Sequence, residues 1–225
     1  MTLHTVLPDG CSIEYIDHYG SDLRVANTAR VSMDKWKEIF DLDDVGLINY
    51  LAKNKHDSPM RHCVATFRFA MPIFVERQWF KHRLGIEVNS LSGRYVQFDE
   101  QLYLPTEYRK GSKSIKQGSL DKLVNDNLLA YLLVTESYRV AYETYKSLLA
   151  IGVCKEQARM VLPLSLMTRF VATIGIQAAF HIYELRFHEH AQREIQPFAY
   201  QLGQHFSRLY PVTWKALLEH RLNVK

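Results

Sequence analysis

Two runs of β-branched and aromatic residues constrain the fold of this chain more than any other feature. They are CVATFRFAM at 63–71 and LMTRFVATIGI at 166–176. Alternation places Phe67 and Phe69 on one side of the first run, and the second is typical of a buried strand. Shorter strands are expected at 11–16 and 94–98. Because helical patterns dominate the later part of the chain, the sequence predicts an α+β fold, a single domain with a mixed or antiparallel sheet and several long helices.

Helix start and stop signals lie between and after these strands. Ser21 can cap a helix through its side-chain oxygen, Pro72 suits a first helical turn, and Gly152 can end a long amphipathic helix. The predicted helices span 21–32, 43–54, 72–83, 128–149, 155–161 and 177–222, the last with a break at Pro211.

Composition sets broad limits. The 225 residues suffice for one domain, 1–225, with a sizeable core. A net charge of +4 suits anionic small molecules and weak nucleic-acid binding equally well. Cys11, Cys63 and Cys154 form neither a CxxC pair nor a disulfide framework, which favours a reducing compartment. The N-terminus does not resemble a leader and no apolar run reaches membrane-spanning length, so a cytoplasmic protein without a membrane partner is expected.

Residues 107–121, EYRKGSKSIKQGSLD, are predicted to form an exposed basic loop. A basic nucleic-acid-binding protein is therefore an alternative of a different class. Base stacking needs aromatic side chains, and Tyr108 is the only one in this segment. No nucleic-acid partner is expected.

Positive side chains gather in three places: at 81–83 with Arg94, at Arg159 with Arg169, and at 186–190. An arginine binds phosphate or carboxylate through two parallel bonds, and Ser or Gly nearby lets backbone N–H groups approach an anion. Each cluster taken alone is more typical of a solvated helix face. The first cluster is followed by SLSG at 90–93, and this combination favours a phosphate-bearing ligand.

Two other chemistries have weaker support. Cys154 lies at a predicted helix start, where the dipole can lower a thiol pKa, but no paired histidine is indicated. His181, His188 and His190 with Glu184 form HxxExxxHxH, which lacks the one-face spacing of HExxH. No metal is expected.

Five segments, in order, resemble the signature segments of the flavin-dependent thymidylate synthases. PIFVERQWFKHR at 72–83, with NSLSGRY at 89–95, is similar to the family's RQWxRHR and NExSxRY. The resemblance runs from about residue 10 to residue 210. The other similar segments are ARVS at 29–32, HDSPMRH at 56–62, GVCKEQARMVLPLSLMTRF at 152–170 and LRFHEHAQREIQ at 185–196.

This resemblance implies the family's fold, a homotetramer, and reductive methylation of dUMP to dTMP. It implies FAD as hydride carrier, 5,10-methylenetetrahydrofolate as carbon donor and NADPH as reductant. All four molecules are anionic, which accounts for the clustered positive charge. Because flavin hydride reduces the pyrimidine directly, no cysteine nucleophile is implied. The alternative on the same scaffold is methylation or hydroxymethylation of another pyrimidine deoxynucleotide such as dCMP.

Position by position, the resemblance implies one catalytic residue and two overlapping binding sets. Arg186 would lie against the pyrimidine edge and favour ionisation at N3, and Ser58 would reach the flavin of a neighbouring subunit. The implied FAD set is Ser58, Lys81, His82, Arg83, Ser90, Gly175, Gln177, His181 and His190. The implied dUMP set is Gln78, Lys81, Ser90, Leu91, Ser92, Gly93, Arg94, Arg159 and Arg186.

The chain departs from the family pattern at several of these positions. Lys81 replaces the first Arg of RHR, and eight residues rather than seven separate Arg83 from Ser92, which predicts weaker flavin retention. Ser90 stands where the family has Glu or Gln, and Glu87 is a candidate to substitute for that acid. The other departures are Arg61 for the glutamate of SPFEH, Gly175-Ile176-Gln177 for Asn-x-Arg, and His181 for a following Asn.

Overall fold

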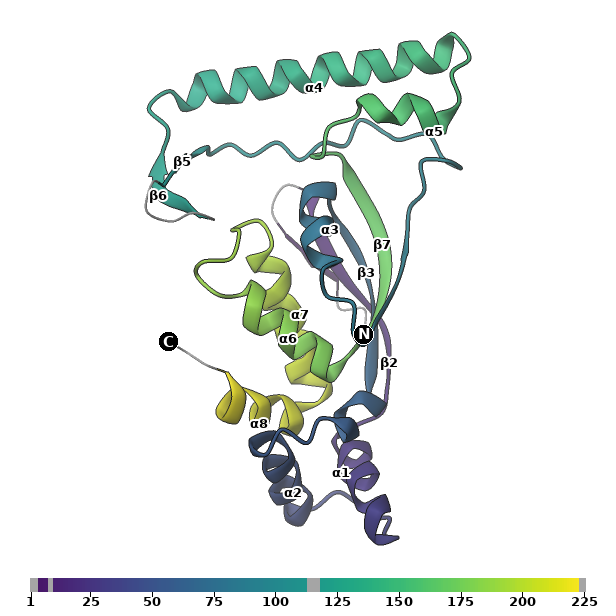
Figure 1. Cartoon of the computed structure of the whole chain (residues 1–225), viewed down its shortest axis with the longest axis vertical. Coiled ribbons are helices and arrows are strands. Elements are labelled where there is room, and N and C mark those ends of the chain that lie inside the picture. The colour runs from purple at the N-terminus through teal and green to yellow at the C-terminus, as the bar shows by residue number, and fades with distance from the viewer. Residues whose placement is uncertain (1–3, 8–9, 113–117, 223–225) are drawn as a thin grey trace.

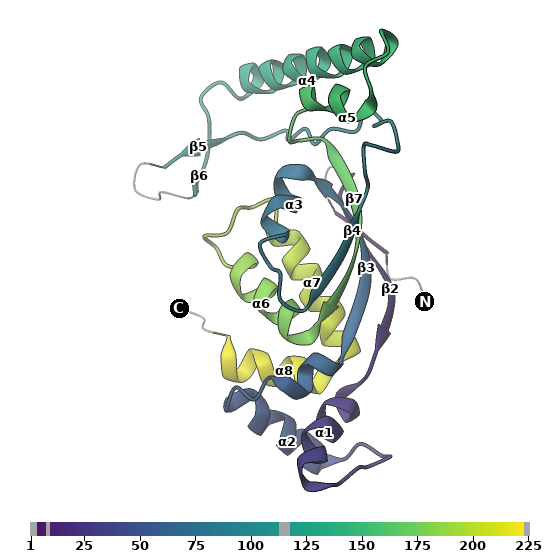
Figure 2. The ribbon, with the colours of Figure 1, turned by 45° about the vertical axis from the view of Figure 1, so that its right-hand side comes forward.

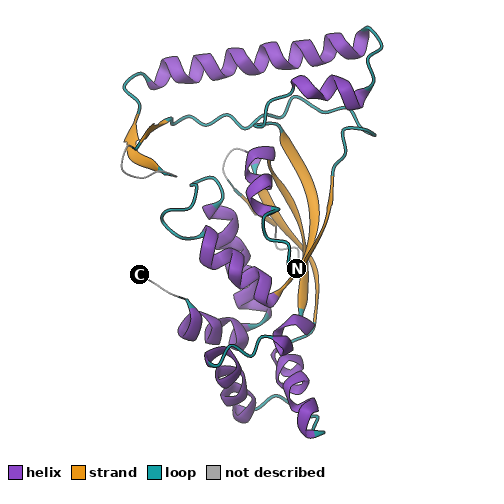
Figure 3. Cartoon of the chain, in the orientation of Figure 1, coloured by secondary structure: helices purple, strands orange, loops and turns teal. Residues whose placement is uncertain are grey.

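An antiparallel sheet of five strands runs through the middle of the molecule in the order β1-β2-β3-β7-β4 (Figure 1). The computed structural model describes residues 4–7, 10–112 and 118–222. The helices lie on one face of the sheet and beyond its two ends, so the predicted α+β class is confirmed (Figure 3). The strands are β1 (His4–Val6), β2 (Ser12–Tyr19), β3 (Val64–Pro72), β4 (Ile86–Ser90) and β7 (Met167–Gly175).

The two strand-like runs of the sequence, β3 and β7, pair with each other along their whole length. Phe69 lies opposite Phe170, and their rings stack with centroids 4.8 Å apart. Alternate residues of both strands are buried on this inner face, whereas Arg68 on the outer face is exposed. A side-chain period of two therefore gives the sheet one apolar face, which must be covered.

Three helices cover that face: α3 (Ile73–Trp79), α6 (Ile176–Arg186) and α7 (Gln196–Leu209), as Figure 2 shows. The largest fully buried side chains gather between these helices and the sheet or beside α8 (Pro211–Arg221). They include Trp79, Trp214, Tyr210, Phe67, Phe69, Phe198 and Phe206.

The lower end of the molecule is closed by α1 (Asp22–Arg30), α2 (Leu42–Lys53) and α8. Ser21 caps α1 as predicted, accepting a hydrogen bond from the backbone N of Arg24. The Asp22 carboxylate accepts from the backbone N of Val212 and Thr213 at 3.0 and 2.9 Å. This contact satisfies free N–H groups at the start of α8, which follows the predicted break at Pro211. The helical region predicted over 177–222 is also interrupted at 187–195, between α6 and α7, which the sequence did not predict.

The upper end consists of α4 (Asn127–Ala150), α5 (Lys155–Ala158) and a hairpin of β5 (Arg109–Gly111) and β6 (Ser119–Leu123). Gly152, with φ of +89°, follows α4 as predicted. The basic segment 107–121 thus contains hairpin strands, and its residues 113–117 lie outside the described part of the chain. Among the described helices, none combines the length and the apolar character that crossing a membrane requires.

Three local predictions are corrected by the structure. Residues 94–98 form turns and irregular backbone, whereas the strand of this region is β4, inside the segment expected to be a loop. The helix predicted over 72–83 ends at Trp79, and 80–83 follow it as a turn and irregular backbone. Pro72 is the N-cap of that helix rather than part of its first turn. The polar run EVNS becomes a strand because β7 offers it an open edge to pair with.

Candidate active site

A cavity of about 1030 Å³ opens where β7 ends, β4 begins and α6 starts. Gly85 shapes its rim: its φ of +73° is a left-handed conformation that favours glycine, and its carbonyl accepts from Gly175 N at 2.9 Å. The lining is mainly cationic, with two carboxylates, Glu87 and Glu184. Its positive side chains are Lys55, Arg61, Lys81, Arg83 and Arg221. Such a lining suits an anionic ligand.

At the wall of this cavity, His82 meets Arg186. The Arg186 Nε donates to His82 Nε2 at 2.9 Å, and the His181 ring lies edge-on to His82 with centroids 5.5 Å apart. Burial, with the charges of Arg186 and His181, lowers the pKa of His82 to about 4. His82 is therefore neutral at pH 7, with Nε2 as acceptor and the proton on Nδ1. Burial also lowers the pKa of Arg186 from its ordinary value, but the guanidinium remains charged.

Two departures from the family pattern, both lining the cavity, contact each other. The Arg61 Nε donates to the side-chain oxygen of Gln177 at 2.6 Å. Gln177 in turn donates to Asp57 at 2.5 Å, and Arg221 pairs with the same carboxylate. Asp57 thus neutralises Arg221 and orients Gln177, while the guanidinium of Arg61 stays on the cavity wall, held by a neutral amide.

The segment Ser90–Arg94 forms a second polar group beside Arg159. Leu91 N donates to Arg169 O at 2.8 Å, which attaches the segment to β7. Gly93 is tightly enclosed: a Cβ there would lie 2.2 Å from the Phe98 ring and 3.1 Å from the Cδ of Arg159. Only glycine fits this position, so the loop comes close to Arg159 without a side chain between them.

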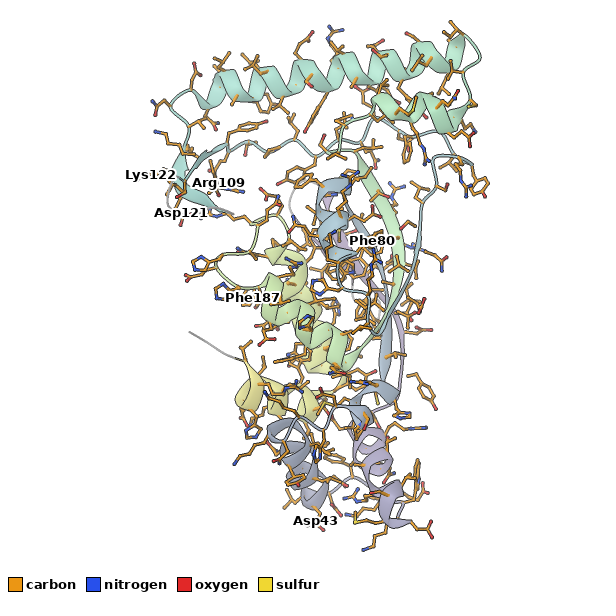
Figure 4. The ribbon with its side chains drawn as sticks, in the orientation of Figure 1. Asp43, Phe80, Arg109, Asp121, Lys122 and Phe187 are labelled. Atoms are coloured by element: carbon orange, nitrogen blue, oxygen red, sulfur yellow. The ribbon has the colours of Figure 1, made fainter. Side chains whose placement is uncertain are left out.

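Gln78, at the end of α3, contacts the loop 187–195, which in turn contacts the β5–β6 hairpin. Its side-chain N donates to Gln192 Oε1. Two residues further on, Glu194 accepts from Arg109 of β5 at 2.7 Å, and neighbouring Arg193 pairs with Asp121 of β6. Figure 4 shows Arg109 and Asp121 projecting from the hairpin above the loop that contains Phe187.

The structure brings together most, but not all, of the predicted flavin residues. Lys81, His82, Arg83, Gly175, Gln177 and His181 line the cavity. Ser58, Ser90 and His190 do not line it: Ser58 starts a 3-10 helix, Ser90 faces α3, and His190 lies in the exposed loop after α6. The contribution of Ser58 to a neighbouring subunit stays a prediction.

Cysteine and metal chemistry have little geometric basis in the described residues. Cys154 is exposed at the N-cap of α5 and does not line the cavity. Burial raises the pKa of Cys63 to about 11, which disfavours a thiolate. No group of three or more His, Cys, Asp or Glu side chains suited to a metal ion occurs within the described ranges.

Comparison with known proteins assigns the chain to a family. The family model for thymidylate synthase complementing protein matches residues 14–212. The flavin-dependent thymidylate synthase of Pseudothermotoga lettingae is 35% identical, over 93% of this chain and 90% of its own. That of a Thermus thermophilus strain is 38% identical, over 93% and 76% respectively. The chain belongs to the flavin-dependent thymidylate synthase family.

Solved structures agree with this assignment. A UMP/dUMP methylase, PolB from Streptomyces cacaoi, bound with 5-Br dUMP, has a TM-score of 0.83 and 33% identity to this chain, covering 93% of it and 95% of PolB. PolB bound with 5-Br UMP matches with the same TM-score and 32% identity. The protein is therefore a methyltransferase, and the family resemblance inferred from its motifs is confirmed.

Several residues at the site were not identified from the sequence. His220 and Arg221 reach the cavity from the end of α8, outside every motif, and Lys55 reaches it from the turn after α2, next to the segment 56–62. Glu76 contacts Ser90 from α3. The one signal for Glu76 was an acid between the buried Val75 and Trp79 in a short apolar helix.

Proposed function

We propose that this enzyme converts dUMP to dTMP by reductive methylation, with FAD as hydride carrier, 5,10-methylenetetrahydrofolate as carbon donor and NADPH as reductant. The observation that carries the proposal is the cationic cavity at the His82–Arg186 contact, in a chain of this family. The names of the relatives support a flavin, and the nucleotide bound to PolB supports a uridine nucleotide. The comparisons do not favour dCMP or nucleic acid as the ligand.

The cavity residues fit a flavin dinucleotide. Its diphosphate needs cations and N–H donors, and the cavity supplies Lys55, Arg61, Lys81 and Arg83 besides Arg221, which is paired with Asp57. Lys81, His82 and Arg83 would hold the cofactor with Gly175, Gln177 and His181, and His190 would border the pocket. When bound, the flavin supplies the hydride that reduces the pyrimidine. Neutral His82 adds no charge and can donate a hydrogen bond through Nδ1.

The nucleotide would lie against the segment Ser90–Arg94. Arg94 and Arg159 match a phosphate dianion, and the absence of a side chain at Gly93 lets Arg159 lie close to this segment. Gln78 and Lys81 would complete this set. Arg186, half-buried and charged, would stabilise the negative charge that develops on the pyrimidine as N3 ionises.

A homotetramer is part of the proposal. The outward side of α4 exposes four leucines, Leu128, Leu129, Leu132 and Leu133, which is unusual for a helix in contact only with water. If Ser58 completes a neighbour's site, mixing inactive Ser58→Ala and Arg186→Ala proteins should restore part of the activity through hybrid sites. A monomer with full turnover, measured by light scattering and assay together, would refute this part.

The test of the proposed function is product identity. Purified protein with FAD is incubated with NADPH, methylenetetrahydrofolate and one of dUMP, UMP or dCMP, and the product mass is measured. A gain of one methyl group on dUMP is expected, with flavin absorbance in the protein. Methylation of dCMP alone, or colourless protein without nucleotide turnover, would refute the proposal.

A further inference from the structure

Glu76 is a buried acid that touches the nucleotide segment. It lies in α3, is only 9% exposed, and its Oε1 accepts from the Ser90 hydroxyl at 3.2 Å. Ser90 stands where the family signature carries Glu or Gln. Ser90, which replaces the residue of the signature, is thus in direct contact with the buried acid.

A carboxylate in this position has a cost that calls for an explanation. Acids are almost never buried without a cationic partner or several hydrogen bonds, because removing the charge from water is unfavourable. Within the described residues, no ion pair includes Glu76, whereas buried Asp44 pairs with Arg30 and buried Asp22 caps α8. Burial raises the pKa of Glu76, against weaker opposite effects of Ser90 and Arg77. Packing alone would be served better by an apolar residue.

The contact acts on the backbone that enters the nucleotide segment. Ser90 is the last residue of β4, and the next residue, Leu91, is attached to β7 through Arg169 O at 2.8 Å. Glu76 therefore fixes one end of the segment, while the enclosure of Gly93 fixes its centre.

Glu87, the acid expected from the sequence to substitute for the missing one, is placed elsewhere. It lies in β4 three residues before Ser90, so the two side chains project from opposite faces of the strand. Glu87 lines the cavity. Of the two acids, Glu76 is the one in contact with Ser90.

We propose that Glu76 is the positioning acid of the nucleotide segment, acting through Ser90 in place of the Glu or Gln side chain that the family signature carries after Asn89. In this chain the carboxylate comes from Glu76 of the helix α3, and the residue at the signature position is Ser90 of the strand β4. This inference rests on the proposed function, because the segment is assigned to the nucleotide there.

The test is an exchange of the acid between the two positions. Four proteins are compared: wild type, Glu76→Ala, Ser90→Glu, and the double variant Glu76→Ala/Ser90→Glu. Calorimetric titration of the flavin-loaded proteins gives the Kd for dUMP, and thermal melting reports folding. Glu76→Gln tests whether an acceptor of the same shape suffices, and Glu38→Gln, an exposed acid, is the control.

Glu76→Ala is expected to weaken dUMP binding by about tenfold, the effect typical of losing one hydrogen bond to a charged group. Ser90→Glu should weaken dUMP binding more than Glu76→Ala does, because the carboxylates of Glu76 and Glu at position 90 would repel each other. The double variant should recover affinity to within about threefold of wild type, which additivity cannot produce. Glu76→Gln should weaken binding less than Glu76→Ala does, because it keeps an acceptor for the Ser90 hydroxyl but removes the charge.

Two results would overturn the inference: a Glu76→Ala protein with unchanged dUMP affinity, or effects of the two single variants that simply add in the double variant. A purely structural role predicts lower melting temperatures with no change in Kd, and that result also overturns it. Wild-type protein that binds no pyrimidine nucleotide would instead refute the proposed function, whereas normal wild-type binding without coupling refutes this inference alone.

Discussion

Arg186 donates a hydrogen bond to His82 across 2.9 Å, although 104 residues separate them in the chain. The bond requires His82 Nε2 to be unprotonated, in agreement with a pKa lowered to about 4 by burial first and by Arg186 second. The guanidinium of Arg186 therefore sets the tautomer of His82. The other N–H groups of Arg186 remain able to donate to a ligand.

Arg186→Ala is expected to lower kcat by about 100- to 1000-fold, the loss typical of removing one donor that stabilises developing charge. The flavin absorbance should remain. The pKa of His82, followed by NMR titration, should rise towards its ordinary value but stay below it, because burial persists. Unchanged turnover in this variant would contradict the catalytic role of Arg186.

Arg61→Gln is expected to weaken FAD binding by about tenfold, since it removes a charge-assisted contact from the cavity wall. The structure holds Arg61 through Gln177 and leaves it outside the described ion pairs. Fluorescence titration gives the Kd for FAD. Arg139→Gln, which removes an exposed arginine from α4, is the control. Equal affinities in all three proteins would show that Arg61 does not contact the cofactor.

Arg109→Ala is expected to raise the KM for dUMP several-fold with a smaller change in kcat. The loss of the 2.7 Å contact with Glu194 should loosen the turn that holds Gln192 against Gln78. Lys122→Ala, at an exposed position on the same hairpin, is the matched control. Steady-state kinetics with dUMP varied measure both constants. If the Arg109 variant and the Lys122 variant have the same KM for dUMP, the hairpin does not influence nucleotide binding.

Cys154→Ala is expected to retain turnover within about twofold, as for a typical exposed substitution. Its thiol is exposed, outside the cavity lining, and 3.6 Å from the Gln157 side chain. Assay of the variant under the wild-type conditions measures this. A folded Cys154→Ala variant without activity would support a mechanism in which Cys154 is the nucleophile.

His205→Leu is expected to protect the fold against acid. Burial, aided by the charge of Arg208, lowers the pKa of His205 to about 4. Between pH 6.5 and 4 the unfolded chain therefore binds a proton that the folded chain does not, and the free energy of unfolding falls as the pH falls. A full shift of this size corresponds to about 3 kcal/mol.

The measurement is urea unfolding of both proteins at pH 7.5 and 5. The His205 ring packs against Phe67 and Tyr15 with no described hydrogen bond, so leucine suits the site. His82 contributes in the same direction in both proteins and cancels in the comparison. The same loss of stability between the two pH values in wild type and variant would contradict the assignment.

The sequence by itself determined the local elements and the family. β3, β7 and the Ser21 cap of α1 follow from side-chain alternation and from local hydrogen bonding, which need no distant partner. The motifs were recognisable because their residues are close together in the chain. The strand β4 was missed because EVNS has little strand preference of its own and depends on the edge of β7.

Only the tertiary structure decided which departures from the family pattern belong together. Glu76 contacts Ser90 because α3 packs on β3 and β7 and β4 pairs with β7, and Arg61 contacts Gln177 because η3 (Ser58–His62) lies beside α6. The residues of each pair lie in different elements, 14 and 116 positions apart in the sequence, so no motif spacing predicts either contact. Burial then gives these contacts their effect, since a hydrogen bond or a charge counts for more where water is excluded.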